Sequence, residues 1–509
     1  MISVEADYTV DLFNRVAKVE WPFESEEIRE FFRFQPPGYF FSPKFKKKVW
    51  DGFISMMRGN RIPAGLFLAQ KRLMEKHGLT FEIRDHRVRP KFKPLTFPKG
   101  WTPRPFQVEC VSKMVKNSGT GGIILNATGT GKTSLMGLYF RRLEGRAVFV
   151  VDELTLLAQA REELSSVLGE KVGTIGQGKF EPERITVATI QTLSIAGRRK
   201  EFKKWKKDLD VLVIDEVHQM VNKRSQKVVK SLNPKTVFGL TATLELEKPE
   251  VAMPTYSLCG RVLFEYDYKT GTADGYLAHA VAIGVDLLRT HPKAKYEPYQ
   301  DLYEDQVVLD SRRNGLVIDL VHEALKLGKH VAVIVERVRH LKELSKRLKK
   351  KGIRHRTVYG LKKVKDRIES KERFEAGECK VLLTNKVFKK GINLKVLDLI
   401  VEASQNASAN DSRQKLGRGV RLSSEKRGLI YIDVGERKPK GAPAKKVNRF
   451  EKATKSRRDA LAKQGVPVIP MRAKCGARKI LVKAARELDL LLASRAVESV
   501  SRVKRSKVS

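Results

Sequence analysis

Short apolar, β-branched runs alternate with longer amphipathic runs from about residue 120, and the alternation starts again after residue 325. The first series is GGIIL, TSLMGLYFRRL, AVFVVD, TLLAQAREELSSVL, ITVATI, VLVID and TVFGLTAT, and the second is HVAVIVE, HLKELSKRLKKKG, KVLLTN, LDLIVEA and GLIYIDV. Strands that alternate with helices are typical of a parallel α/β sheet. The sequence therefore predicts two α/β units of similar size with a cleft between them, joined by a crossover at residues 260–325.

The regions that flank these two units are more basic than the chain average. Residues 41–100 carry fifteen Lys and Arg against four Asp and Glu, and residues 435–509 carry twenty-two against six. We expect four domains, at residues 1–100, 101–270, 271–435 and 436–509. Within the last, the composition predicts a flexible GERKPKGAPAKKVNRF, helices at KATKSRRDALAKQG and KCGARKILVKAARELDLLLASRAV, and a disordered SRVKRSKVS.

The formal net charge of +43, from 101 Lys and Arg against 58 Asp and Glu, indicates a polyanionic partner. A membrane surface would also attract this charge, but no run approaches the roughly 18 uncharged apolar residues of a spanning helix. Nucleic acid is therefore favoured. The N-terminus has no basic-then-apolar order, so we expect a protein that stays in the cytoplasm. The four cysteines are far apart and the nine histidines form no ligand-spaced pair, which predicts neither disulfides nor zinc.

A glycine-rich segment, NATGTGKTS at 126–134, follows an apolar run and opens a helical pattern, which is the setting of a phosphate-binding loop. Gly129 and Gly131 let backbone N–H groups close around phosphate oxygens, and the helix N-terminus favours their negative charge. Lys132 can reach the β and γ phosphates, and Thr133 can ligate Mg²⁺. The alternative interpretation is an ordinary glycine turn before a helix.

Two acids end the apolar run in VLVIDEVHQM. Asp215 can hold Mg²⁺ through water, and Glu216 can orient and deprotonate the water that attacks the γ phosphate. The alternative is an ordinary acidic loop after a strand, but the phosphate loop about eighty residues upstream favours catalysis. The next strand ends with two hydroxyls in GLTATL, at 239–244.

Two arginines and a glutamine recur at helical spacing in RQKLGRGVR, at 413–421. Gln414, Arg418 and Arg421 are 4 and 3 residues apart, which predicts that they share one face of a helix. Such a face can supply arginine fingers to the charge that develops on a phosphate. Solvated arginines on a helix are the alternative.

A basic and aromatic cluster, FSPKFKKKVWDGF, occupies residues 41–53. Lys44, Lys46, Lys47 and Lys48 are expected to contact phosphates. Aromatic rings among lysines could stack on exposed bases. For Phe45, Trp50 and Phe53, however, the favoured interpretation is that they are core residues of a small domain.

These blocks, in this order, resemble superfamily 2 helicases of the DExH branch. The matching segments are RPFQ (Arg104 to Gln107), ATGTGKT, VDELTLLAQ, VATIQTL, DEVH, TAT, AVIVERVRH, LLTNKVFKKGINL and QKLGRGVR. The group that holds RecG, XPB and the UvsW-type recombination helicases of bacteriophages is the most similar. The N-terminal FFRFQPPGYFFSPKFKKKVWDGFI…RIPAGLF is similar to the small domain that precedes the motor in the UvsW-type helicases, so the resemblance covers about residues 1–435.

The resemblance implies two tandem RecA-like domains, a small α+β nucleic-acid-binding domain, a basic helical extension, and ATP with Mg²⁺ as cofactors. The implied nucleotide-binding residues are Arg104, Gln107, Thr128, Gly129, Thr130, Gly131, Lys132 and Thr133. The implied catalytic residues are Lys132, Asp215, Glu216, Gln414, Arg418 and Arg421, with Thr133 and Asp215 at the metal. The implied DNA-binding residues are Lys44, Lys46, Lys47, Lys48, Thr155, Thr189 and Thr384. Many relatives have an acid where this chain has Asn393, which puts any coupling role of that acid in doubt.

The hypothesis is a monomeric ATP-dependent DNA translocase that acts on branched DNA and moves forks and Holliday junctions in recombination, replication and repair. Three alternatives remain open: an RNA helicase, the motor subunit of a restriction system, and a duplex-binding or annealing factor whose nucleotide site only switches affinity. Turnover of ATP separates the last from the others.

Overall fold

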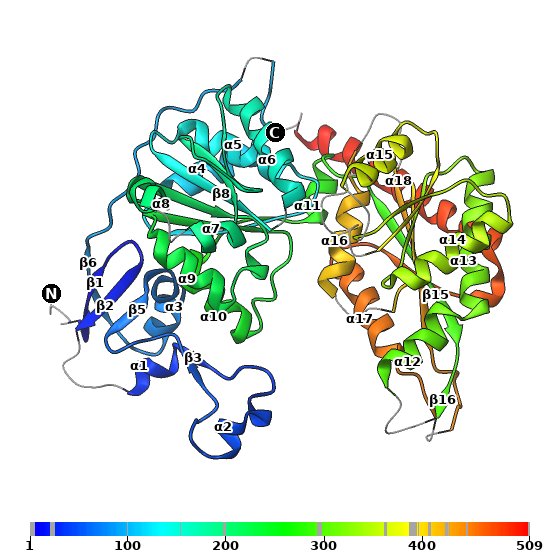
Figure 1. The fold of residues 1–509 in the computed structure, drawn as a ribbon, viewed down its shortest axis with the longest axis horizontal. Coiled ribbons are helices and arrows are strands. Elements are labelled where there is room, and N and C mark those ends of the chain that lie inside the picture. The colour runs from blue at the N-terminus through cyan, green and yellow to red at the C-terminus, as the bar shows by residue number, and fades with distance from the viewer. Residues whose placement is uncertain are drawn as a thin grey trace. The chain divides into compact units, whose positions relative to one another are not determined.

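The computed structural model describes residues 6–20, 26–98, 100–152, 154–196, 200–292, 298–360, 364–385, 394, 396–405, 409–422, 426, 428–443 and 446–506. The chain divides into two compact units. The first consists of Met1–Ala127 and Gly131–Tyr266, and the second of Thr128–Thr130 and Asp267–Ser509. Among the residues that the structure describes, no sheet is shared between the two units (Figure 1).

The first unit begins with a small α+β domain, whose four-stranded sheet has the order β5-β2-β1-β6. Its elements are β1 (Tyr8–Leu12), β2 (Val16–Glu20), α1 (Glu26–Glu30), β3 (Arg33–Phe34), a 3₁₀ turn (Tyr39–Phe41), α2 (Pro43–Lys46), β4 (Ile54–Ser55), β5 (Arg61–Pro63), α3 (Ala64–Lys76) and β6 (Phe81–Asp85). Burial alternates along β2, where Ala17 and Val19 enter the core. Helix α3 adds Leu66 and Phe67 to the same core.

This N-terminal domain packs closely on the α/β domain that follows it. Helix α3 lies against α10 (Pro249–Cys259), and Met253 and Tyr256 of α10 pack on the N-terminal core. A Cβ atom added to Gly65 would lie 2.4 Å from the carbonyl oxygen of Tyr256 and 2.6 Å from the nitrogen of Gly260. Two backbones can approach this closely only where a side chain is missing, so the packing requires glycine at position 65.

Two polar side chains in the β1–β2 turn add hydrogen bonds across the same boundary. The amide of Asn14 donates to the carbonyl oxygens of Gly119 at 2.8 Å and Lys235 at 3.0 Å. The guanidinium of Arg15 donates to the carbonyl oxygen of Leu258 at 2.6 Å, and burial lowers the pKa of Arg15 to about 10. Buried polar groups need partners, so these bonds fix how the two domains fit.

The α/β domain of the first unit is built on an eight-stranded sheet with the order β10-β9-β11-β8-β12-β13-β7-β14. All neighbouring pairs are parallel except β9 and β10. Its strands are β7 (Gly121–Asn126), β8 (Arg146–Val151), β9 (Gly173–Gly176), β10 (Lys179–Glu181), β11 (Ile185–Thr189), β12 (Leu209–Ile214), β13 (Thr236–Thr241) and β14 (Val262–Tyr266). Its other helices are α4 (Pro105–Lys116), α5 (Lys132–Arg142), α6 (Leu154–Leu168), α7 (Ile190–Ala196), α8 (Lys200–Trp205) and α9 (Lys223–Leu232).

The second unit has a seven-stranded sheet with the order β18-β19-β17-β20-β21-β15-β23, in which every pair is parallel. The strands of this sheet are β15 (Ala280–Leu288), β17 (Val331–Ile334), β18 (Arg356–Val358), β19 (Val381–Thr384), β20 (Leu399–Glu402), β21 (Leu429–Arg437) and β23 (Val468–Arg472). Strands β16 (His291–Pro292) and β22 (Lys446–Val447) form a separate two-stranded sheet. Its helices are α11 (Tyr268–Ala273), α12 (Tyr299–Tyr303) with a π-helical turn (Glu304–Val308), α13 (Ser311–Lys326), α14 (Val338–Lys350), α15 (Val364–Glu375), α16 (Ala409–Gly419), α17 (Glu451–Ala462) and α18 (Ala477–Ser506). The prediction of two tandem parallel α/β units is confirmed.

The segment predicted as a crossover, residues 260–325, contributes strands to both sheets. Strand β14 pairs with β7 in the first sheet, and β15 pairs with β21 and β23 in the second. Eight of the nine residues of β15 are buried, as in a strand covered on both faces. The TGTADG stretch, expected as a loop, lies largely within α11.

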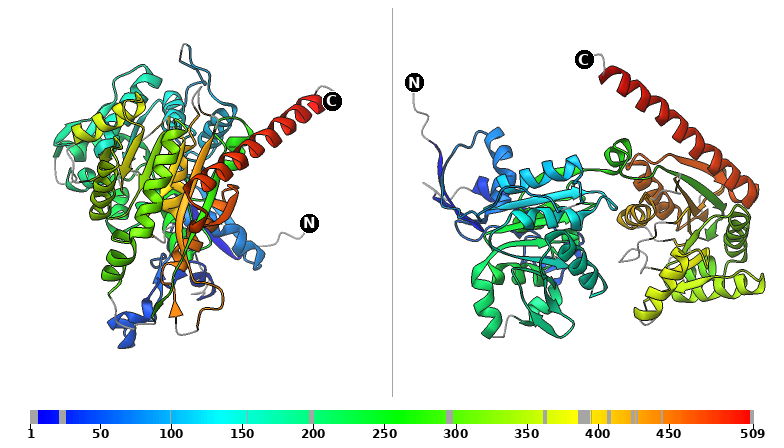
Figure 2. Two further views of the ribbon diagram at one scale, coloured as in Figure 1. Left: turned by 90° about the vertical axis from the view of Figure 1, so that its right-hand side faces the viewer. Right: turned by 90° about the horizontal axis from the view of Figure 1, so that it is seen from above.

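The C-terminal region is an integral part of the second unit. Strand β23 forms the edge of the sheet beside β15, and Ile480, Leu481 and Ala484 of α18 enter the same core as the strands. Figure 2 shows α18 lying along this unit and running past the sheet at its C-terminal end. The end expected to be disordered is helical to Ser506. The stretch expected to be flexible includes the end of β21 and, at β22, a strand that pairs with β16.

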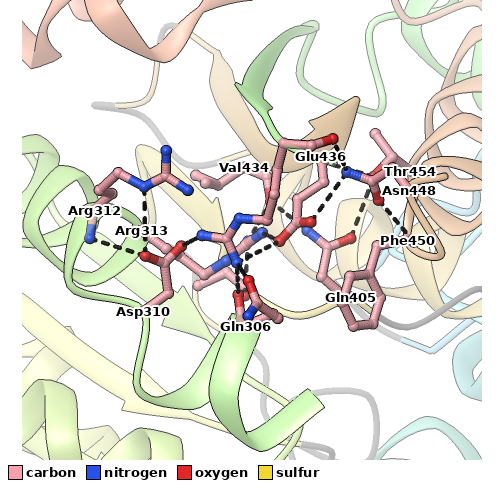
Figure 3. A network of polar contacts seen from close by, with 12 residues as sticks. Gln306, Asp310, Arg312, Arg313, Gln405, Val434, Glu436, Asn448, Phe450 and Thr454 are labelled. Carbon is pink, nitrogen blue, oxygen red and sulfur yellow. Dashed lines mark hydrogen bonds and ion pairs between the residues drawn. The ribbon is translucent and has the colours of Figure 1, made fainter. Parts of the chain in front are cut away.

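A buried polar network ties this region to the sheet (Figure 3). The guanidinium of Arg313, which is fully buried, donates to Glu436 Oε1 at 2.9 Å and to the carbonyl oxygen of Val434 at 2.7 Å. Glu436 accepts from the amide of Asn448 at 3.3 Å, and its own N–H donates to Thr454 Oγ1 at 3.0 Å. A buried charge is tolerated when it is paired and hydrogen-bonded, so the network fixes the chain path into α17.

We predict that Gly65→Ala destabilises the first unit. The new Cβ would overlap backbone atoms that cannot rotate away, and overpacking of this kind costs about 1–3 kcal/mol. Thermal unfolding followed by calorimetry should show a lower midpoint. Gly315→Ala is the matched control, because a Cβ at that position of α13 meets nothing within 4 Å. Alanine in a helix is favoured by up to about 1 kcal/mol, so the control should not lower the midpoint. Equal effects of the two variants would contradict the packing argument.

Candidate nucleotide and nucleic-acid sites

The glycine-rich segment connects the end of β7 to the start of α5, as the sequence predicts. Gly129 and Gly131 have φ angles of +96° and +84°, a region that favours glycine. Gly131 is the N-cap of α5, and Lys132 is its first residue. The free N–H groups of the first turn and the helix dipole favour an anion at this position.

Lys132 lies beside the acid of the second predicted motif. Its Nζ is 3.6 Å from Oε1 of Glu216, and both side chains are mostly buried. Among the described residues, this amine has no hydrogen-bond partner. A buried ammonium normally needs such partners, so the amine of Lys132 is placed to bind oxygen atoms of a ligand.

Asp215 and Glu216 follow β12 directly. The N–H of Asp215 donates to the carbonyl oxygen of Val150 at 2.9 Å, which extends the strand ladder to the first acid. The N–H of Glu216 donates to Oδ1 of Asp215 at 3.1 Å, and Glu216 has a φ angle of +48°. A left-handed backbone costs energy for a residue with a side chain, and such strain is found at functional sites.

Thr241 joins the acidic pair to the end of β13. Its hydroxyl can donate to Glu216 Oε2 at 3.3 Å or to the carbonyl oxygen of Thr243 at 2.9 Å, and it lies 2.8 Å from Nδ1 of His218. The N–H of Thr243 donates to the same hydroxyl oxygen at 3.1 Å. Burial lowers the pKa of His218, so its ring is neutral at pH 7. The side chains of Glu216, Thr241 and His218 therefore form one connected group.

His218, Thr241 and Thr243 were not among the predicted site residues. The sequence signal was present, because His218 is the last residue of DEVH and the two threonines belong to TAT. What the sequence could not show was that β12 and β13 are neighbours, which brings these residues into contact.

Residues 104–107 form the start of α4. Arg104 is the N-cap, and its N–H donates to Oε1 of Gln107 at 2.9 Å in a capping box. Gln107 is buried, and its Nε2 would lie 3.4 Å from a Cβ placed on Gly131. Phe106 stacks on Tyr266 with ring centroids 3.9 Å apart. The capping box thus places the glutamine next to the glycine-rich segment.

The predicted magnesium residues supply suitable donors. Thr133 is in the first turn of α5, and Asp215 follows β12. Mg²⁺ prefers oxygen ligands, keeps several waters, and is usually held by one or two protein groups together with substrate phosphates. The described residues hold no cluster of three or more His, Cys, Asp or Glu that could bind a metal by itself. A threonine hydroxyl and an aspartate carboxylate are oxygen donors of the kind that Mg²⁺ prefers.

The predicted arginine face is only partly a helix face. Gln414 and Arg418 lie in α16, which ends at Gly419, whereas Arg421 forms an isolated bridge with Leu277. The prediction that all three share one helical face is therefore wrong. The reason is that the N–H of Ala278 pairs with the carbonyl oxygen of Val420 at 2.7 Å, which draws the chain into an extended form.

Helix α16 is anchored by the residue after Gln414. Lys415 is 2% exposed and pairs with Glu402, which is 0% exposed, at 2.5 Å. Glu402 also accepts from the hydroxyl of Tyr431 at 3.0 Å and from that of Ser404. Burial raises the pKa of Tyr431, so this hydroxyl stays a donor. The network holds α16 on the sheet.

Three threonines were predicted to contact DNA. Thr189 and Thr384 end β11 and β19, and they are 2% and 0% exposed. The hydroxyl of Thr189 lies 2.9 Å from that of Thr192. Thr155 is in α6, but its side chain lies outside the described residues, and so does Asn393.

Of the four predicted DNA-binding lysines, Lys44 and Lys46 lie in α2, and Lys47 and Lys48 follow it directly. Lys44, Lys46, Lys47 and Lys48 are all exposed, and among the described residues they form no ion pair. Phe45, Trp50 and Phe53, which were expected in the core, are instead partly exposed and do not belong to the N-terminal core. Two residues of β3 and two of β4 are too few to cover them with a sheet.

Comparisons with known proteins agree with the motif order. Family models match at residues 24–85 (DNA helicase UvsW, N-terminal), 101–246 (Type III restriction enzyme, res subunit) and 315–423 (Helicase conserved C-terminal domain). The ATP-dependent DNA helicase uvsW of Enterobacteria phage T4 is 25% identical over 82% of this chain and 89% of that protein. Helicase 22 of Sulfolobus islandicus filamentous virus is 24% identical over 66% of this chain and 64% of that protein.

Among solved structures, S. cerevisiae Dbp5 bound to RNA and ADP BeF3 has a similar fold. The TM-score is 0.54 and the identity 15%, over 78% of this chain and 94% of that chain. The resemblance inferred from the motifs is confirmed. No helix of the described residues is long and apolar enough to span a membrane.

We predict that Thr241→Val lowers kcat for ATP hydrolysis at least tenfold while KM for ATP stays within about twofold. Valine keeps the volume but removes the hydroxyl that bonds Glu216 and His218, and a lost buried hydrogen bond costs about 1–3 kcal/mol. Steady-state ATPase assays give both constants. Thr255→Val is the control, because the hydroxyl of Thr255 donates within its own helix, to the carbonyl oxygen of Val251, and has no other partner in the described part of the chain. A rise in KM alone would argue that Thr241 acts on nucleotide binding.

Proposed function

We propose that this chain, which belongs to the superfamily 2 ATP-dependent helicases, uses ATP hydrolysis to move along DNA and to remodel branched DNA. Its substrates would be forks and Holliday junctions in recombination, replication and repair. The observation that carries the proposal is the buried amine of Lys132, placed at a phosphate loop and 3.6 Å from Glu216. The net charge of +43 and a phage relative named as a DNA helicase support DNA as the partner.

Residues of the first unit would bind the nucleotide and position the attacking water. Lys132 binds the β and γ phosphates, and Thr133 and Asp215 supply the protein oxygens for Mg²⁺. Glu216 accepts a proton from water, with its carboxylate oriented by Thr241. His218 contacts the same threonine hydroxyl and so helps to hold this carboxylate in place.

Residues of the second unit would respond to the nucleotide. We propose that Gln414, Arg418 and Arg421 stabilise the charge that develops on the transferred phosphoryl group. Arg421 lies in an extended segment rather than in α16, so its position depends on the pairing of Leu277 and Ala278. Hydrolysis would then change how the two units are arranged, and this change would move the protein along the DNA backbone. We propose that the working form is a monomer.

Lys132→Ala should abolish ATP-driven junction migration and leave DNA binding within about twofold. The lysine contacts phosphates of the nucleotide and not those of DNA. A four-way junction with labelled arms reports migration, and fluorescence anisotropy without nucleotide reports binding. Lys116→Ala, at an exposed position at the end of α4, is the control. Migration that survives Lys132→Ala would overturn the assignment of the ATP site.

Replacing Lys44, Lys46 and Lys47 with glutamine should weaken DNA binding and make it less dependent on salt. Each phosphate contact contributes about 0.9 to the slope of log K against log salt for duplex DNA. Titrations between 50 and 200 mM salt, roughly the range in which counterion release is measured, give this slope. Substitution of the exposed Lys203, Lys204 and Lys207 is the charge-matched control. An unchanged slope in the first variant would remove these lysines from the DNA interface.

Point substitutions test this better than removal of residues 1–100. Removal would uncover Met253 and Tyr256, which belong to the packing between the N-terminal domain and α10. A loss of binding could then reflect misfolding.

ATPase rates on different polymers separate the proposal from its alternatives. We expect the rate to rise on forks and four-way junctions above the rates on single-stranded DNA, linear duplex and RNA. Stimulation by RNA alone would favour an RNA helicase. A nuclease or methyltransferase that purifies with the chain would favour a restriction motor, and binding without turnover would favour an annealing factor.

A further inference from the structure

Residues 33–55 form a lobe of the N-terminal domain, which we call the aromatic lobe. Its base is the two-residue ladder of β3 and β4, in which Arg33 pairs with Ser55 and Phe34 with Ile54. Helix α2 lies at its far end (Figure 1). The lobe is thus a loop of about twenty residues closed at its base by strand pairing.

Contacts inside the aromatic lobe hold its shape. The rings of Tyr39 and Phe45 meet edge to face at 4.9 Å, and Nε1 of Trp50 donates to the carbonyl oxygen of Phe53 at 2.6 Å. The guanidinium of Arg33 lies 4.4 Å from the centre of the Phe53 ring. These contacts order a segment that has no core of its own.

The end of the aromatic lobe exposes its apolar side chains. Val49 is 75% exposed and Phe41 is 71% exposed, the two largest values for large apolar side chains among the described residues. Phe40 is 50% exposed, and its ring centroid is 4.4 Å from that of Phe41. An ordered segment that presents adjacent rings to solvent marks an interaction surface.

The charges around these rings indicate what they contact. A hollow is lined by Phe40, Phe45, Lys46, Lys48, Val49, Trp50 and Asp51. Asp51 is the only acid in residues 38–53, and it lies 3.9 Å from Arg33 and accepts from the N–H of Phe53. Lysines beside exposed rings match a polymer that offers phosphates and flat apolar faces together, which is a nucleic acid with accessible bases.

We propose that Phe40 and Phe41 stack on the bases exposed where a duplex ends or branches, while the neighbouring lysines hold the flanking phosphates. The inference rests on the proposed function in that the polymer is DNA, and it names the feature of DNA that the aromatic lobe recognises. An intact duplex offers phosphates but no open base face, so the rings distinguish a branch from continuous duplex. The lysines alone cannot make this distinction, because phosphates carry no such information.

The test compares two DNA forms without ATP. Anisotropy measures binding to a labelled fork, and relaxed closed circular duplex, which has no end or branch, competes for the protein. The double variant F40A/F41A should weaken fork binding about tenfold or more and change competition by the circle less than about twofold, as expected when base stacking is lost. F40W/F41W should keep the fork preference, because tryptophan also stacks. The lysine-to-glutamine variant described above should weaken both forms.

Phe97→Ala is the matched control, since Phe97 is 44% exposed but lies outside the aromatic lobe. Thermal unfolding should show F40A/F41A to be folded, and F41A alone gives a second variant that leaves the Tyr39–Phe40 contact in place. An equal loss of binding to fork and circle, or no loss of binding to either, would overturn the inference. It would also be overturned if F40A/F41A lost only binding to phosphatidylserine vesicles, because the rings would then contact a membrane surface. The binding assay needs no turnover, so a wild-type chain that binds forks but moves no junction would refute the proposed function and leave this inference standing.

Discussion

Parallel strand pairing decides where the chemistry of the first unit is placed. Parallel strands need crossover connections, so their C-terminal ends meet at one edge of the sheet. Strands β7, β12 and β13 therefore bring the glycine-rich segment, the two acids and Thr241 together, although residues 126 and 241 are far apart in the chain. The approach of Glu216 to both Lys132 and Thr241 depends on this register.

The sequence was sufficient where one short segment carries the whole signal. The glycine-rich segment, the acid pair and the tandem α/β pattern are all local, and the structure contains them. It was insufficient where partners come from distant segments. The nine-residue strand β15 was not among the strands expected from the alternating pattern. Arg421 lies outside α16 because its segment pairs with Leu277 and Ala278. No local pattern could reveal either pairing.

Composition explains why residues 435–450 were expected to be flexible, whereas the two helices expected after them are present as α17 and α18. This segment is rich in Lys, Gly and Pro and looks solvated, yet its Glu436 and Asn448 are buried and hydrogen-bonded to each other. Basic side chains of α17 are buried in the same way. Arg457 is 1% exposed and donates to Asp433 at 2.8 Å, and Arg458 donates to the same carboxylate. The rings of Phe45 and Trp50 show the reverse case, since aromatic residues expected inside a core lie partly in solvent. Composition predicts average burial, whereas individual partners decide it.

The contact between Gly65 and Gly260 also has a mechanical consequence. Where two backbones touch without an intervening side chain, the two segments have little room to move against each other, because close-packed interiors resist compression. The packing at Gly65 therefore sets the position of the N-terminal domain on the α/β domain that carries Lys132 and Glu216, and leaves no room for a hinge at this contact.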